Sequence, residues 1–233
     1  MLRVVNTEQF KKAIDQIALF IDECNIHINE DGFTVKAFDN AQMLYVEYNL
    51  DSKGLEGELE SNVFGVNIVE LNKILSKISS SDKLKFSFNQ YELDLIVEGD
   101  YNRTYTFPLK ELDEKELNVN SSDYPIIMKE NATILRDIFS STKLVADSVL
   151  FDCKDSKVTL FADGINGKYK TDIAVESESN FQTKFSSAHL YNMLRNVDAQ
   201  TKVTIKINPQ QPLFVSYSLG NNHIKYYLAH MFV

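Results

Sequence analysis

Cysteine is scarce in this chain, with only Cys24 and Cys153 among 233 residues. Two cysteines argue against a disulfide framework and favour buried free thiols in a reducing compartment. Long apolar runs are missing as well, and none approaches the roughly 20 residues of a membrane helix. The opening residues, Met1 to Val5, contain neither the apolar core nor the cleavage site of a signal peptide. We therefore expect an intracellular protein that does not bind membranes.

Motifs for catalysis and cofactor binding are also absent. The chain contains no GxGxxG or GxxxxGKS/T loop for phosphates, and its serine pairs lack the glycines of a nucleophile elbow. No HExxH or CxxC pair predicts zinc, because the four histidines are scattered: His27, His189, His223 and His230. The adjacent carboxylates Asp22 and Glu23 are better explained as a solvated helix end than as a metal site. The sequence therefore predicts no catalytic residue, no metal, no cofactor and no enzyme activity.

An excess of basic residues is missing too. The net charge is -9 and the isoelectric point is near 5.0. Taken alone, this balance argues against a nucleic-acid-binding protein, since such proteins usually carry a net positive field. Nucleic-acid binding would require that the few basic residues gather on one face.

What the chain does contain is an internal repeat. Residues 6–37 align with residues 131–162 at a constant offset of 125, and residues 71–89 align with 190–208 at an offset of 119. Both copies show a helical pattern followed by alternating strand patterns. We interpret this order as a duplication that produced two similar domains.

Each copy is predicted to hold two amphipathic helices. Thr7 and Asn131 are the expected N-caps of the first and third helices. The second helix is expected to begin near Asn67, and the fourth follows Ser186 and Ser187. Apolar residues three and four apart predict the buried stripes: Phe10, Ile14, Ile17 and Ile21; Ile68, Leu71, Leu75 and Ile78; Leu135, Ile138 and Phe139; Leu190, Met193, Leu194 and Val197.

Alternating apolar and polar residues predict strands joined by tight turns. Residues 25–29 and 33–37 flank a turn at Asp31 and Gly32, and the same pattern recurs at 83–88 with 91–95 and at 202–207 with 213–217. Short connections imply antiparallel sheets. The expected fold class is α+β, with two similar domains that each pack two helices on antiparallel sheets.

An acidic, polar segment separates the two copies. We expect a first domain at residues 1–108, a connecting loop at 109–124 and a second domain at 125–233. A solvated linker would not need apolar residues spaced along it, yet this one carries Leu109, Leu112, Leu117 and Val119. These side chains either fix the loop to the domains or line a binding site.

Three segments follow one another in order on the duplicated chain: residues 33–39 (FTVKAFD), residues 65–75 (GVNIVELNKIL) and residues 211–213 (QPL) leading to 223–229 (HIKYYLA). Together they resemble the proliferating cell nuclear antigen family, the sliding clamps of eukaryotes and archaea. The second is similar to the family's GVNL…SKIL helix and the third to its PL…HLKYYLAP ending. The resemblance covers nearly the whole chain. It implies a DNA-clamp fold, and a head-to-tail homotrimer closed into a ring with helices lining the hole.

The resemblance also implies partners that insert a short peptide, the PIP box, into an apolar pocket beneath the connecting loop. The matching residues are Phe38, Gln42, Met43 and Tyr45 in the first domain, Leu117 and Val119 in the loop, and Pro212, Tyr227, Leu228, Ala229 and His230 in the second domain. This chain departs from the family at His230, where the family has proline. It also departs at Asn118 and Asn120, where many members have glycine and proline. Both departures bear on peptide preference rather than on the clamp assignment.

Basic residues on the predicted helices would then face DNA. They are Lys11, Lys12, Lys73, Lys77, Arg136, Lys143 and Arg195. The alternative is that these residues only form the solvent-exposed face of amphipathic helices and do not bind DNA. The implied partners are duplex DNA bound without sequence preference, a DNA polymerase, a clamp loader, and PIP-box proteins such as flap endonuclease and ligase.

Two rival interpretations stay open. One is a subunit of a heterotrimeric or checkpoint-type clamp, which would remain a monomer or dimer alone. The other is a small metal-dependent nuclease or hydrolase, for which no inward cluster of Asp, Glu and His is evident. The source is open between archaeal, eukaryotic and viral, with a nuclear location if eukaryotic and a cytoplasmic or nucleoid location if archaeal.

Overall fold

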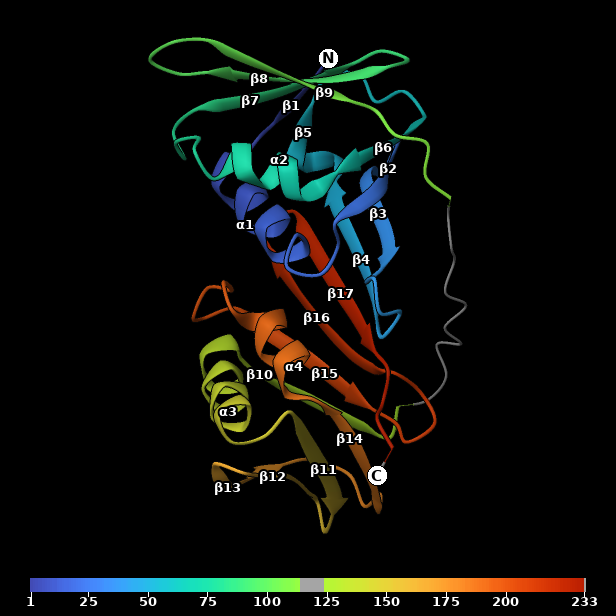
Figure 1. The fold of residues 1–233 in the computed structure, drawn as a ribbon, viewed down its shortest axis with the longest axis vertical. Coiled ribbons are helices and arrows are strands. Elements are labelled where there is room, and N and C mark those ends of the chain that lie inside the picture. The colour runs from blue at the N-terminus through green and yellow to red at the C-terminus, as the bar shows by residue number, and fades with distance from the viewer. Residues whose placement is uncertain (114–123, 233) are drawn as a thin grey trace. The chain divides into compact units, whose positions relative to one another are not determined.

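The duplication is present in the computed structural model, which describes residues 1–113 and 124–232 (Figure 1). An offset of 125 carries β2 (Glu23–Asn29) onto β11 (Ser148–Lys154) without any shift at either end. An offset of 119 does the same for β6 (Asn62–Asn67) onto β14 (Phe181–Ser186), and for α2 (Ile68–Leu75) onto α4 (Ser187–Leu194). The repeat predicted from the sequence is therefore confirmed.

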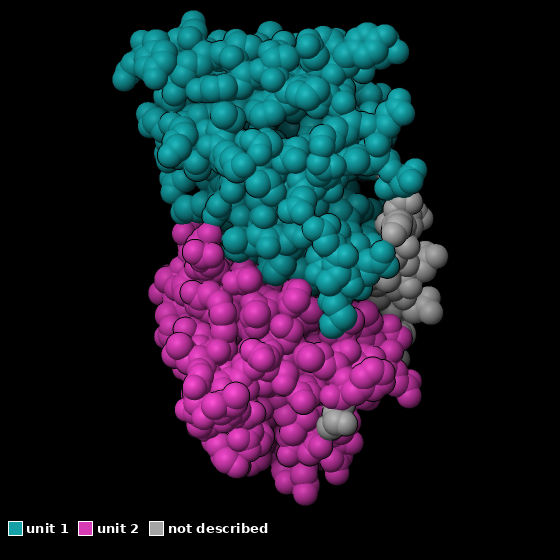
Figure 2. Space-filling view, in the orientation of Figure 1, with its two compact units in different colours: residues 1–117, 218–224 teal, residues 118–217, 225–233 magenta. Residues whose placement is uncertain are grey.

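Unit 1 comprises residues 1–117 and 218–224 and is teal in Figure 2. Besides β2, β6 and α2, it contains β1 (Leu2–Val4), α1 (Thr7–Ile17), β3 (Gly32–Phe38), β4 (Leu44–Asp51), a 3-10 turn at Ser52–Gly54, β5 (Leu55–Glu56), β7 (Lys83–Phe88), β8 (Glu92–Glu98) and β9 (Arg103–Pro108). The strands pair antiparallel in the orders β5-β1-β7-β8-β9 and β6-β2-β3-β4. Helices α1 and α2 lie side by side (Figure 1).

Unit 2 comprises residues 118–217 and 225–233 and is magenta in Figure 2. Besides β11, β14 and α4, it contains β10 (Ile126–Asn131), α3 (Ala132–Val145), β12 (Lys157–Gly164), β13 (Gly167–Ala174), β15 (Lys202–Ile207), and most of β16 (Leu213–Leu219) and β17 (Asn222–Leu228). The strands pair antiparallel in the orders β13-β12-β11-β14 and β10-β15-β16. Helices α3 and α4 contact each other as α1 and α2 do.

Aromatic side chains fill the interior of each unit. In unit 1 the ring of Phe86 meets Phe10 and Phe33 edge-on, with centroids 5.6 and 5.9 Å apart. In unit 2 Phe151 and Phe185 meet at 90° across 5.3 Å. Edge-to-face pairs of this kind add to the energy of apolar burial. The Phe10–Phe86 pair joins α1 to β7, whereas Phe151 and Phe185 lie on the neighbouring strands β11 and β14.

The turn between β2 and β3 requires glycine. Gly32 has a φ of 122°, and a Cβ atom there would lie 2.0 Å from the carbonyl oxygen of Leu50. No other residue fits that space or that dihedral without strain. The predicted turn at Asp31 and Gly32 is thereby confirmed.

The helix starts differ from the expectation in one place. Asn6, not Thr7, is the N-cap of α1, and its Oδ1 accepts a hydrogen bond from the amide of Gln9 at 3.0 Å. Thr7 is the first helical residue, and its hydroxyl donates to the carbonyl of Asp82 at 2.7 Å. Asn6 and Thr7 are both residue types that cap helices, so the sequence allowed either one. The contact with Asp82 draws the Thr7 side chain inward. Asn131 does precede α3, but its side chain accepts no capping hydrogen bond.

The predicted apolar stripes are buried, with one exception. Ile138 on α3 is only half-buried, whereas Leu135 and Phe139 are in the core. Ile21, Ile78 and Val197 are buried as expected, but the helices end before them. Within residues 1–113 and 124–232, no helix is long and apolar enough to span a bilayer.

Candidate functional site

Four of the predicted DNA-facing residues, including Lys11, lie on or just after the helices of unit 1. Lys12 on α1 forms an ion pair with Glu8 at 3.0 Å, one turn earlier. Lys73 on α2 pairs with Glu70 at 2.7 Å. Lys77 follows the end of α2 and is exposed. Glu8 and Glu70 each lie beside their lysine on the helix surface, so they offset part of the positive charge that Lys12 and Lys73 present.

Lys11 and Arg136 have a further structural role. The Lys11 ammonium donates to the carbonyl oxygen of Ile78, just beyond the end of α2. Nη1 of Arg136 donates to the carbonyl oxygens of Val197 at 2.7 Å and Leu194 at 3.5 Å, at the end of α4. The last carbonyls of a helix have no partner within it, and they attract cations. Each basic residue therefore stabilises the C-terminal end of the neighbouring helix.

The two remaining basic residues belong to unit 2. Lys143 lies in the last turn of α3, and its ammonium is 4.5 Å from the centroid of the Tyr191 ring. Arg195 occupies the C-cap position of α4 and is exposed. A positive charge is favourable at the C-terminal end of a helix, where both residues lie. Both residues keep their charge near the surface, where phosphates could reach it.

The loop between β3 and β4 carries part of the predicted partner pocket. The Asp39 carboxylate accepts hydrogen bonds from the amides of Met43 and Leu44 at 2.8 and 2.9 Å. This bracing lets Gln42 adopt a φ of 55°, a left-handed conformation that is uncommon outside glycine. Strain of this kind persists where surrounding contacts hold the backbone, and it often marks binding sites.

Phe38 and Tyr45 flank the same loop. Their ring centroids are 4.8 Å apart, with the rings tilted by 54°. Phe38 is half-buried, whereas Tyr45 is only 2% exposed. Tyr45 is therefore a support beneath Phe38 rather than a surface that a ligand touches directly.

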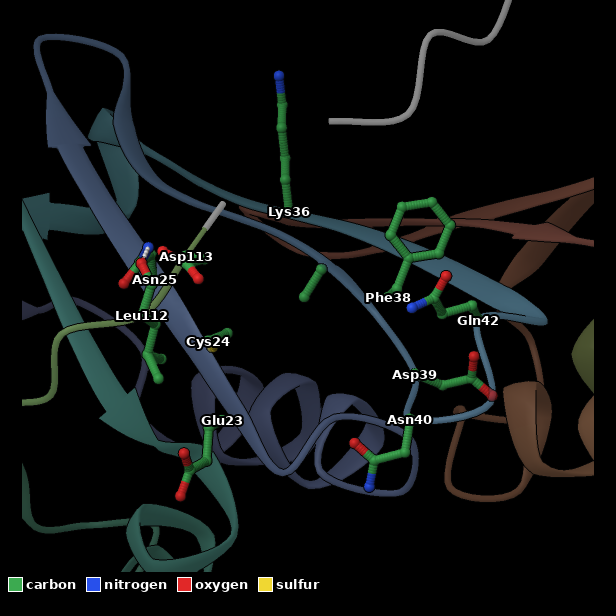
Figure 3. A pocket seen from close by; sticks show the side chains of 11 residues that line it. Glu23, Cys24, Asn25, Lys36, Phe38, Asp39, Asn40, Gln42, Leu112 and Asp113 are labelled. Atoms are coloured by element: carbon green, nitrogen blue, oxygen red, sulfur yellow. Dashed lines mark hydrogen bonds between the residues drawn. The ribbon is translucent and has the colours of Figure 1, made fainter. Parts of the chain in front are cut away.

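A cavity of about 300 Å³ opens beside the loop (Figure 3). Phe38 lines it from the end of β3, Gln42 from the loop and Asn25 from β2, and Leu112 and Asp113 line it from the start of the connecting loop. Most of the lining is polar, and Leu112 and Phe38 supply apolar surface. The predicted residues Phe38 and Gln42 are thus brought together with the described part of the connecting loop.

The start of the connecting loop is fixed to unit 1. The amide of Lys110 donates to the carbonyl of Gly65 at 2.9 Å, and Nδ2 of Asn25 donates to the carbonyl of Leu112 at 3.0 Å. The Lys110 ammonium bonds the Glu23 carboxylate, and this hydrogen bond holds the pKa of Glu23 below its ordinary value. The spaced leucines do serve attachment here, since Leu112 lies against β6 and the cavity.

The other predicted pocket residues in the structure belong to unit 2. The Pro212 carbonyl accepts from the Tyr124 hydroxyl at 3.2 Å, and the Tyr227 ring packs edge-on against Phe214 at 5.3 Å. Leu228 is fully buried, whereas Ala229 is half-buried and His230 is exposed. Leu117 and Val119 lie outside the described residues. The complete pocket therefore stays a prediction.

The C-terminal tail has a position that the sequence reading missed. The Met231 amide donates to the carbonyl of Lys184 at 2.7 Å and forms an isolated bridge with β14. Gly65 bridges Lys110 at the corresponding site of unit 1, since position 184 lies 119 residues after position 65. The tail and the connecting loop are thus equivalent segments of the two copies. The repeat offset itself was the available signal.

Both cysteines are free and buried, as predicted. Burial raises the pKa of the Cys24 and Cys153 thiols to about 12. Thiols of this kind are poor nucleophiles at neutral pH. Within residues 1–113 and 124–232, no three His, Cys, Asp or Glu side chains gather closely enough to hold a metal ion.

Comparison with known proteins agrees with this geometry. The family model described as proliferating cell nuclear antigen, N-terminal domain, matches residues 1–117. The DNA polymerase sliding clamp of Pyrococcus furiosus is 23% identical over 221 residues, covering 90% of this chain and 89% of the relative. The proliferating cell nuclear antigen of Chaetomium thermophilum is 26% identical over 248 residues, covering 97% of this chain and 96% of the relative.

Solved structures show the same fold. PCNA from Thermococcus kodakaraensis superposes with a TM-score of 0.88 at 21% identity, covering 99% of this chain and 100% of that one. The PCNA2–PCNA3 complex from Sulfolobus tokodaii gives a TM-score of 0.85 at 19% identity, with 99% of each chain covered. The fold is that of a DNA clamp, which confirms the predicted α+β class.

The chain belongs to the proliferating cell nuclear antigen family of sliding clamps. Proteins of this family are non-enzymatic scaffolds, so the chain is not an enzyme.

Proposed function

We propose that this protein is a DNA sliding clamp, a polymerase processivity factor that encircles duplex DNA as a homotrimer and tethers PIP-box partners. The relatives named DNA polymerase sliding clamp support DNA and a polymerase as partners. An intracellular location in association with DNA follows from that role. The domain limits 1–108, 109–124 and 125–233 are part of the same proposal.

The observation that carries the proposal is a pair of sheet edges. Strand β9 ends the five-stranded sheet of unit 1, and β13 ends the four-stranded sheet of unit 2. An edge strand presents unpaired N–H and C=O groups that can pair with another chain. When the first edge of one copy meets the second edge of the next, the contact is head-to-tail and can close a ring.

Both edges leave part of an apolar layer uncovered. On β9, Tyr105 lies opposite the buried Leu95 and is itself only half-buried. On β13, Ile173 lies opposite the buried Val158 and is likewise half-buried. Side chains opposite one another across a ladder point to the same face. Joining the two edges would therefore continue the apolar layer from one copy into the next.

The basic residues of the helices suit a sliding contact. Phosphate contacts carry no sequence information and can be exchanged along the duplex, whereas base readout would stop sliding. A net charge of -9 disfavours DNA on the rest of the surface. Retention then depends on topological linkage rather than on affinity.

Two measurements test the proposal. Light scattering during size-exclusion chromatography of the pure chain should give three times 26.7 kDa, which is about 80 kDa. Loaded protein should stay on nicked circular DNA and leave when that DNA is cut to a linear form. Retention that is unaffected by linearisation would mean that the protein does not encircle DNA.

A second candidate is a subunit of a heterotrimeric or checkpoint-type clamp. It is favoured by the similarity to a PCNA2–PCNA3 complex, in which two different clamp chains are associated. The same chromatography distinguishes the two. A mass of one or two copies at micromolar concentration would favour the heteromeric clamp.

A further inference from the structure

Three aromatic side chains gather on one face of unit 2. Phe214 on β16 meets Tyr227 on β17 edge-on, with ring centroids 5.3 Å apart, and it meets Tyr124 at a tilt across 6.4 Å. All three side chains are half-buried. The Tyr124 hydroxyl donates to the carbonyl oxygen of Pro212. Since Pro212 and Tyr227 are both predicted residues of the partner pocket, this aromatic cluster extends the predicted pocket onto β16.

Lys206 adds a positive charge to the aromatic cluster. It lies on β15 directly opposite Phe214 in the ladder, and side chains opposite one another point to the same face. Its ammonium is 5.0 Å from the centroid of the Phe214 ring and 5.9 Å from that of Tyr124. Both distances are within the range of cation–π attraction. The rings therefore hold the ammonium beside the cluster.

The face around Lys206 is basic, although the chain as a whole has a net charge of -9. Residues at alternate positions of a strand share a face, so Lys202 and Thr204 accompany Lys206 on β15. On the neighbouring β10, Lys129 is paired with Thr204, and Ile127 is paired with Lys206. The outward positions of these two strands thus contain three lysines and no carboxylate.

The charge of Lys206 is not offset across the ladder. In the other sheet of unit 2, Lys168 lies opposite Asp163 and forms an ion pair with it at 2.7 Å. Lys206 instead has Ile127 on one side and Phe214 on the other. Opposite charges across a ladder stabilise each other, and here that pairing is missing. A carboxylate from a ligand would supply it.

The arrangement of the rings favours an acidic peptide over a single-stranded nucleic acid. Nucleobases bind aromatic sheet faces by stacking on open rings. The Lys206 ammonium lies over the Phe214 ring, and Tyr227 and Tyr124 are inclined to that ring by 64° and 48°. These rings therefore do not form a flat platform for bases. A carboxylate needs only the ammonium and room beside it.

We propose that Lys206 selects partner peptides that carry aspartate or glutamate beside their aromatic anchors. The anchors occupy the predicted pocket, and a neighbouring carboxylate pairs with the ammonium that Tyr124 and Phe214 hold. Lys129 and Lys202 attract further acidic residues of the same peptide. The inference rests on the proposed tethering of PIP-box partners and names a charge preference within it.

The test uses two PIP-box peptides with the same aliphatic and aromatic anchors. One has glutamate on both sides of the anchors, and the other has glutamine at those positions. Calorimetry on the full-length wild-type protein should show about fivefold tighter binding of the glutamate peptide at low salt, as expected for one well-held surface ion pair. In roughly 1 M salt the difference should fall below about twofold, because salt screens exposed charges.

Three variants assign the preference to Lys206. Lys206→Gln should bind the two peptides equally, with the affinity for the glutamine peptide unchanged within about twofold. Lys206→Arg should keep the preference, since the positive charge remains. Lys154→Gln removes the same charge at the exposed end of β11, in the other sheet, and should match wild type.

The possible failures are distinguishable. A wild-type protein that binds neither peptide overturns the proposed tethering and the charge preference with it. Equal binding of the two peptides by wild type, or a preference that persists in Lys206→Gln, overturns the charge preference alone. An oligothymidylate that displaces the glutamate peptide from wild type, and that fails to bind Lys206→Gln, would assign this face to nucleic acid and also overturn the charge preference.

Discussion

Nη1 of Arg136 donates a 2.7 Å hydrogen bond to the carbonyl oxygen of Val197, beyond the end of the neighbouring helix. Lys11 makes the same contact with Ile78 in the other copy. Position 136 lies 125 residues after position 11, and position 197 lies 119 residues after position 78. The duplication has thus preserved a contact between two helices, not only the helices. Both residues were predicted to face DNA, and both also hold helix pairs together.

The first prediction is that Arg136→Ala destabilises the protein whereas Arg195→Ala does not. Removing Arg136 leaves the carbonyls of Leu194 and Val197 without their charged donor, which should cost about 1.5–3 kcal/mol. Arg195 is exposed at the end of the same helix, so its loss should change stability by less than about 0.5 kcal/mol. Urea unfolding of both variants provides the measurement. Equal midpoints would show that the Arg136 contact contributes nothing to stability.

The second prediction concerns the acidic residue beside Lys73. Glu70→Gln removes the 2.7 Å ion pair and frees the lysine for phosphate. Duplex binding should strengthen, and the salt dependence should steepen by up to about 0.9 in logarithmic slope for one added contact. Fluorescence anisotropy over a salt series measures both. Glu92→Gln makes the same change in net charge at the exposed first residue of β8 and serves as the control.

If both glutamate variants bind DNA equally well, the surface of α2 does not face the duplex. Tighter duplex binding by Glu92→Gln than by Glu70→Gln would lead to the same conclusion. Only a selective gain for Glu70→Gln agrees with a helix-lined channel.

The third prediction compares two adjacent serines at the start of α4. Ser187 is fully buried, and its hydroxyl has no hydrogen-bond partner within the described residues. It occupies the position that Ile68 has in the first copy, 119 residues earlier. Ser187→Ala should therefore raise the free energy of unfolding by about 1 kcal/mol, because a buried unpaired hydroxyl is costly.

Ser186→Ala should have the opposite effect. Ser186 is the N-cap of α4 and accepts a hydrogen bond from the amide of His189 at 3.4 Å. Its loss should cost about 1 kcal/mol. Thermal unfolding of the two variants, side by side, checks the difference in sign. Destabilisation by both would mean that the Ser187 hydroxyl has a partner in solution.

Much of this fold could be predicted from the sequence because the repeat and the local periodicity agree. The stripe of Leu190, Met193 and Leu194 is buried as the spacing predicts. Thr7 and Asn6 show where local rules stop, since both residues can cap a helix and only the contact of Thr7 with Asp82 selects between them.

The candidate site was less predictable. Lysine and arginine on a polar helix face are equally consistent with DNA binding and with solvation, and the carbonyl contacts of Lys11 and Arg136 depend on a second helix. Tyr45 matched the family pocket by position, but its burial depends on the packing of Phe38 above it. Contacts of this kind arise between segments that are distant in the sequence.

The fourth prediction concerns acid. The Lys110 hydrogen bond holds the pKa of Glu23 below its ordinary value of 4.5, so this pair contributes stability above that value. The contribution should be lost as the pH falls through the lowered pKa and Glu23 becomes protonated. Unfolding midpoints between about pH 6 and pH 3 should therefore fall less steeply for Glu23→Gln than for wild type. Superimposable pH profiles would show that the pair does not hold the connecting loop.

The last prediction addresses the partner pocket. Phe38 is half-buried above Tyr45 and lines the cavity beside the connecting loop, so it offers ring surface to an incoming PIP-box side chain. Phe38→Ala should weaken binding of a PIP-box peptide about tenfold or more, since loss of an interface anchor costs over about 1 kcal/mol. Calorimetry on the trimeric protein measures the affinity. Leu117→Ser, in the connecting loop, should have an equal or larger effect.

Phe88→Ala is the matched control for the pocket. Phe88 is also a half-buried phenylalanine, stacked on Phe64 at 5.3 Å, but it does not line the cavity. Its removal should affect stability as Phe38→Ala does and leave peptide affinity unchanged. Peptide affinities that are the same for Phe38→Ala, Leu117→Ser and Phe88→Ala would mean that partners bind this clamp elsewhere, because neither predicted pocket residue would then contribute to binding.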